Sequence, residues 1–107
     1  MGLRHLLFAF VLASCVLNST YTPTGDAPAS TRAPADVEVL VGVQPQRTFA
    51  QRGVIRISGY APDASAMIAE ARQAGADNGC DAVVLTLASD TRHDVTTGAC
   101  IVYTAPK

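Results

Sequence analysis

The chain has 107 residues, of which eight are basic and nine acidic, giving a formal net charge of −1 at pH 7. This length accommodates one small domain. Because the charge is near zero and no stripe of basic residues occurs, the composition argues against nucleic acid as a partner.

The chain begins with the three parts of an export signal. The basic start contains Arg4 and His5, and the apolar stretch covers 6–12. Two small residues, Ala13 and Ser14, follow it. As a helix, the apolar stretch would span only about 10–15 Å, whereas a bilayer core needs about 30 Å. We therefore predict a signal peptide over 1–14 and not a permanent membrane span.

The run Leu12-Ala13-Ser14-Cys15 resembles the lipobox of bacterial lipoproteins. This resemblance implies that signal peptidase II cuts between Ser14 and Cys15, and that lipid, palmitate included, is attached to Cys15. Two or three acyl chains anchor a protein stably, since each buried methylene contributes about 0.8 kcal/mol. Because Val16 and not Asp follows the cysteine, the resemblance also implies transport to the outer membrane. An ordinary secretory signal with a chance cysteine is the alternative.

Residues 15–35 are expected to form a disordered tether between this anchor and a folded domain over 36–107. Pro, Thr, Ser and Gly are frequent in the tether, and its large apolar residues are only Val16, Leu17 and Tyr21. Such a segment buries too little apolar surface to order itself. As a coil it would average about 25 Å end to end.

The first part of 36–107 predicts two strands. Four valines alternate with other residues: Val37, Val39, Val41 and Val43. This period of two places their side chains on one face of a strand. A second strand is expected over 54–58, closed by Gly59.

The period then changes to that of a helix. Pro62 and Asp63 suit a helix start, and an alanine-rich stripe recurs every three to four residues up to 77–79. The apolar run 82–88 predicts a central strand, and after a polar loop 99–104 predicts the last one. Strand, strand, helix, strand, strand is the order of an α+β sandwich, with one helix on a mainly antiparallel sheet.

Cys80 and Cys100 remain once Cys15 carries lipid. A disulfide between them is favoured, because a small exported domain has a marginal core and the periplasm is oxidising. In a simple hairpin centred near Arg92 or His93, however, Cys80 would lie opposite a residue beyond Cys100. The bridge therefore needs Cys80 to lean over the sheet from the helix-to-strand turn, or the strands to be separated. Two free thiols or a metal pair are the alternatives.

The sequence contains no recognisable catalytic constellation. His93 neighbours Asp94, and adjacent residues do not easily converge on one metal ion. No serine lies in a Gly-x-Ser-x-Gly elbow, and no glycine-rich phosphate loop occurs. We therefore expect no enzyme, no metal and no cofactor beyond the covalent lipid on Cys15.

Four segments carry a further resemblance: 37–40, 47–49, 79–85 and 98–103. In them the domain resembles the outer-membrane stress-sensor lipoproteins of the Rcs phosphorelay, and it is similar to YbjQ-type domains, which are named for heavy-metal binding. The resemblance implies the α+β fold. Of the sensors' four bridging cysteines only one has a counterpart here, Cys100, and the chain lacks a cluster of metal ligands.

These observations predict a non-enzymatic lipoprotein, anchored at the periplasmic face of the outer membrane, that binds another envelope component in stress sensing or assembly. A periplasmic module that binds a small ligand or a metal is the alternative. If they are exposed, four residues are candidates for contact with the partner: Val43, Phe49, Tyr60 and Tyr103. For Phe49 and Tyr103, core positions are favoured.

Overall fold

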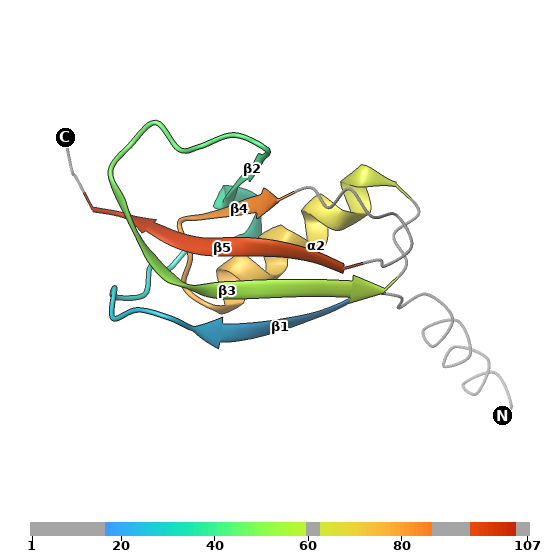
Figure 1. Cartoon of the computed structure of the whole chain (residues 1–107), viewed down its shortest axis with the longest axis horizontal. Coiled ribbons are helices and arrows are strands. Elements are labelled where there is room, and N and C mark those ends of the chain that lie inside the picture. The colour runs from blue at the N-terminus through green and yellow to red at the C-terminus, as the bar shows by residue number, and fades with distance from the viewer. Residues whose placement is uncertain (1–16, 60–62, 87–94, 105–107) are drawn as a thin grey trace, which may run out of the picture.

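The computed structural model describes residues 17–59, 63–86 and 95–104. Its elements are β1 (Leu17–Pro23), the 3-10 helix η1 (Pro34–Asp36), β2 (Glu38–Val41), β3 (Phe49–Gly59), α2 (Ala64–Asp77), β4 (Ala82–Thr86) and β5 (Val95–Tyr103). The strands form one sheet in the order β1-β3-β5-β4-β2, and α2 lies behind it in the view of Figure 1. The expected α+β class, one helix on a mainly antiparallel sheet, is confirmed.

Three of the four strand pairings are antiparallel. β3 pairs with β1 on one side and with β5 on the other, and β5 also pairs with β4. The exception is β2, which runs parallel to β4 at the opposite edge from β1. The predicted central run 82–88 is thus an inner strand over Ala82–Thr86, and its residues 87–88 lie outside the described residues.

β1 corrects the expectation of a disordered tether over 15–35. Leu17–Pro23 pairs residue by residue with Gly53–Gly59 of β3. Leu17 and Tyr21 pack against the core, and exposed residues alternate with half-buried ones along the strand. A strand at a sheet edge needs backbone partners, which polar residues supply as well as apolar ones, and one covered face, to which Leu17 and Tyr21 contribute here. The folded domain therefore includes Leu17 and does not begin near Asp36.

The valine series is interrupted after Val41. Gly42 has a φ of 70°, a left-handed conformation that suits glycine, and its N–H donates to the Leu85 carbonyl at 3.1 Å. The chain turns there, so Val43 lies outside the strand in which the alternation placed it. The segment over 42–48 connects β2 to β3 (Figure 1).

α2 begins and ends as its sequence predicts. The Asp63 carboxylate caps the helix by accepting from the Ala66 N–H at 3.0 Å. Hydrogen bonds from Ser65 and then Ala66 lower the pKa of Asp63. The inner face of the helix is formed by Ala71, Ala74 and Gly75. A Cβ on Gly75 would come within 2.8 Å of Val37 and within 2.9 Å of Val83 in β4, so at this position α2 lies too close to the sheet for a larger residue.

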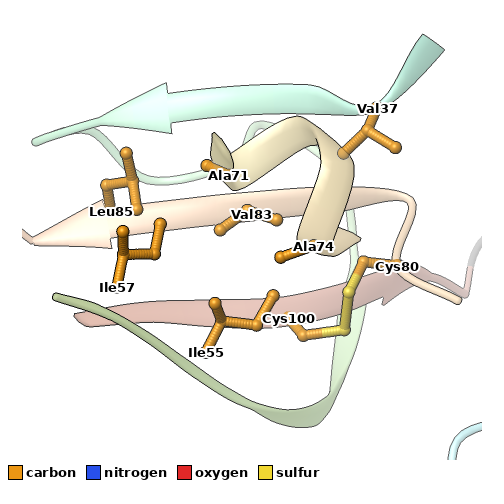
Figure 2. Packing of buried hydrophobic residues seen from close by; sticks show 9 residues of the cluster. All are labelled: Val37, Ile55, Ile57, Ala71, Ala74, Cys80, Val83, Leu85 and Cys100. Carbon is orange, nitrogen blue, oxygen red and sulfur yellow. A yellow bond between two sulfur atoms is a disulfide. The ribbon is translucent and has the colours of Figure 1, made fainter. Parts of the chain in front are cut away.

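The core lies between α2 and the sheet (Figure 2). Its buried members are small or branched: Val37, Ile55, Ile57, Ala71, Ala74, Cys80, Val83, Leu85 and Cys100. Each strand contributes alternate residues to this layer, so the residues between them project from the opposite face of the sheet.

The place of β1 in the domain can be tested at two adjacent residues. Tyr21 packs on the core and Thr20 is exposed. We expect Tyr21→Ala to lower the free energy of unfolding by about 2–3 kcal/mol and Thr20→Ala to change it by less than about 0.5 kcal/mol, as measured by urea unfolding. If 17–23 were a tether, both substitutions would have the same negligible effect.

Candidate functional site

Cys80 and Cys100 are joined by a disulfide with their Cα atoms 5.3 Å apart. Cys80 follows α2 in the turn before β4, and Cys100 lies in β5 opposite Val83 (Figure 2). Cys80 therefore reaches Cys100 by leaning over the sheet from the helix side, which is the first of the two routes weighed above. Both residues are fully buried. The bridge is thus part of the core and not a surface group.

Asp81 forms a polar junction directly after the bridge. Its carboxylate accepts from the Arg32 Nε at 2.7 Å and from the Tyr103 backbone N–H at 2.7 Å. Burial opposes ionisation of Asp81, but hydrogen bonds from Ser30, Tyr103 and Arg32 together lower its pKa. Arg32 also donates to the Asp36 carbonyl at 3.2 Å. Asp81 therefore holds the segment before β2 against the end of β5.

Arg52 makes a second attachment for the segment between β1 and β2. Its Nη1 donates to the Ala27 carbonyl at 2.6 Å and its Nε donates to the Asn78 carbonyl at 3.2 Å. Nearby, the Ser30 N–H donates to the Gly79 carbonyl at 2.9 Å. The segment over 24–36 is consequently packed on the end of α2.

The sheet face opposite α2 contains a hollow of about 290 Å³, and of its lining residues Ile101 is fully buried. Alternate residues of three inner strands line it, since their neighbours point into the core: Val54, Val84, Thr86, Thr97, Ala99 and Ile101. Gln44, Phe49 and Gln51 form its remaining side. None of these side chains titrates near neutral pH, so the hollow offers apolar contact, amides and hydroxyls. We call this surface the open face.

A second hollow, of about 320 Å³, lies beside it against the segment over 43–47. Here the Tyr103 hydroxyl donates to a Glu38 carboxylate oxygen, and the Arg47 guanidinium lies over the Tyr103 ring at 4.0 Å from its centroid. Burial, and then the hydrogen bond to Glu38, raises the pKa of Tyr103 to about 12. The phenol is therefore neutral at physiological pH and acts as a fixed donor.

The contact candidates from the sequence fall in different places. Val43 is 55% exposed and Phe49 is 39% exposed. The core position favoured for Phe49 is wrong, because Phe49 is the first residue of β3 and borders the hollow of the open face. Tyr103 is half-buried, and Tyr60 lies outside the described residues.

The predicted processing and lipidation residues, Ser14 and Cys15, also lie outside the described residues, as does His93 with Asp94. Sequence reasoning missed the open face and the junction at Asp81. Alternation along β3 and β5 could have indicated a second face, but the packing of the segment over 42–48 beside it has no local signal.

Within the described ranges, no helix is long and apolar enough to cross a membrane. In the same ranges, no three His, Cys, Asp or Glu residues are grouped as a metal site would require. No protein-family model, curated protein or solved structure matches the chain.

The contribution of the bridge can be measured by replacing both cysteines. The two residues are 20 apart in sequence. Closing a loop of this size lowers the conformational entropy of the unfolded chain and so raises the free energy of unfolding by about 3 kcal/mol. We expect the Cys80→Ala, Cys100→Ala double variant to lose about that much free energy of unfolding in urea. The unfolded parent protein, kept non-reduced, should show no reactive thiol from these positions. An unchanged midpoint, or two reactive thiols, would contradict the assignment.

The environment of Tyr103 predicts a pH dependence. Its folded pKa of about 12 exceeds the ordinary value near 10, so the folded state retains this proton longer than the unfolded state does. The stability from this group is present below about pH 10 and is lost between about pH 10 and pH 12. Ultraviolet titration of phenolate should find a tyrosine with a pKa of about 12, and Tyr103→Phe should remove this titration step.

Glu38→Gln should lower that late pKa, because it removes the carboxylate that holds the phenol proton. Glu70→Gln, on α2, is the matched control and should leave the titration unchanged. Equal titration curves for the Glu38 and Glu70 variants would contradict the assigned contact.

Proposed function

We propose that this protein is a lipoprotein of the bacterial outer membrane, anchored through Cys15 at the periplasmic face, whose domain binds another envelope component without catalysing a reaction. The observation that carries the proposal is the lipobox Leu12-Ala13-Ser14-Cys15 after a short apolar segment. Only a cysteine at this position can form the thioether to lipid, and small residues before it suit the peptidase.

The surface of the domain supports a binding role. The described residues that line the hollow of the open face are apolar, amide or hydroxyl side chains, a composition suited to contact with another molecule. Val43 and Phe49 expose further apolar surface beside the hollows. We infer that the open face and the segment over 43–49 contact the partner, with stress sensing or assembly as the resulting role.

The proposal can be tested in cells with the full chain. Cys15→Ser should abolish incorporation of labelled palmitate and shift the protein from the membrane fraction to the soluble periplasmic fraction, because no acyl chain is attached. Ser14→Ala is the matched control, since it keeps a small residue before the cut, and it should be labelled and membrane-bound like the parent protein. Membrane association of the Cys15→Ser variant would contradict the anchor.

The same cells can report on the partner. A photo-crosslinking residue at Phe49 should yield a protein adduct, whereas one at Gln73, on the outer side of α2, should not. Absence of any adduct from Phe49, together with a small molecule retained in native mass spectrometry, would favour the alternative of a small-ligand module. A hollow of about 290 Å³ is at the lower limit for such ligands.

A further inference from the structure

β1 starts almost at the residue that would carry the lipid. Leu17 follows Cys15 by two residues, so their Cα atoms are at most about 7 Å apart. Leu17 in turn pairs with Gly59, the last residue of β3. The attachment point is therefore confined to one end of the sheet.

Several other element ends share this location, which we call the anchor end. Ser58 pairs with Val95 at the start of β5, and Thr97 pairs with Thr86 at the end of β4. The opposite end, which we call the far end, contains Pro23, Phe49 and Tyr103. Figure 1 shows the starts of β1 and β5 and the tip of β3 on one side of the domain.

β1 is held too firmly to act as a tether. It pairs with β3 over its whole length, and its Tyr21 ring lies where a Cβ on Gly53 would be 2.6 Å away. Beyond β1 the Thr24 N–H donates to the Arg52 carbonyl at 2.9 Å. Between a lipidated Cys15 and the paired strand there remains a single residue, Val16.

We propose that the anchor end rests directly on the lipid headgroups, with the far end pointing away from the membrane. This inference depends on the proposed lipidation of Cys15. The eleven residues of β3 span at most about 35 Å, so Phe49 and Tyr103 would stand up to about that far from the lipid surface. The exposed described side chains near the anchor end are polar, including Asn18, Ser58 and Asp63, which suits contact with headgroups.

Single tryptophans test this orientation, because the chain contains none. Ser58→Trp and Thr48→Trp place one fluorophore at an exposed position at each end of β3. Both lipidated variants are purified from membranes and reconstituted into phospholipid vesicles that contain a lipid with a nitroxide on its headgroup. We expect the nitroxide to quench the fluorescence of the Ser58→Trp variant several-fold more than that of the Thr48→Trp variant.

A linker insertion is the control for the short connection. Twenty Gly/Ser residues inserted between Val16 and Leu17 leave the lipid and the fold in place, yet they let the domain move about 25 Å from the surface. Quenching of the Ser58→Trp variant should then fall to the level of the Thr48→Trp variant. Circular dichroism of each variant verifies that the domain is folded.

The outcomes separate the two proposals. If mass spectrometry finds no lipid on Cys15, the proposed function and this inference both fail. If Cys15 carries lipid but the two tryptophans are quenched equally, or Thr48→Trp more strongly, the orientation is wrong while the lipoprotein assignment stands. Insensitivity of the Ser58→Trp signal to the linker would likewise overturn the orientation.

Discussion

The disulfide between Cys80 and Cys100 holds the end of α2 on the sheet. The hydrogen bonds of the next residue, Asp81, depend on the position that this bridge gives to the chain. The inner face of α2 consists of alanines and a glycine, so burial of that face contributes little apolar area. The bridge fixes the end of this thin layer. Directly after it, Asp81 accepts from Arg32 and from the Tyr103 N–H, which fastens the segment after β1 and the end of β5 to the same point.

The sequence predicts the elements whose side chains enter this core, since burial imposes a period on them. The stripe of α2 and the run of β4 are examples. β1 is not predicted from the sequence, because its pairing with β3 is made by backbone groups, which polar residues supply as well as apolar ones. Only Leu17 and Tyr21 pack on the core, and two apolar residues four apart are too few for a periodic signal. Threonine and tyrosine, which occur in β1, favour strands. This weak preference is the indication of β1 that its sequence offers.

The bridge and the open face differ in how far sequence could predict them. The cysteine count, together with the expected periplasmic location, favours a disulfide. Its path over the sheet depends on how closely α2 approaches the strands, and this closeness is set at Gly75, where a Cβ would meet Val37 and Val83. For the open face, Val54 and Val84 look like core residues in sequence. They line a hollow instead, because the only α-helix among the described residues covers the other side of the sheet.

Attachment of lipid at Cys15 would couple the position of the domain to its stability. With one residue between the anchor and Leu17, the domain can move away from the surface only if β1 separates from β3. In the proposed orientation such a pull would act along the axis of β1 and would load its pairs with β3, from Leu17 to Pro23, together. An edge strand with few apolar contacts is the kind of element that opens locally before the core does. Leu17 and Tyr21, the two residues of β1 that pack on the core, would resist this opening, so side chains that stabilise the strand would also keep a lipidated domain close to the membrane.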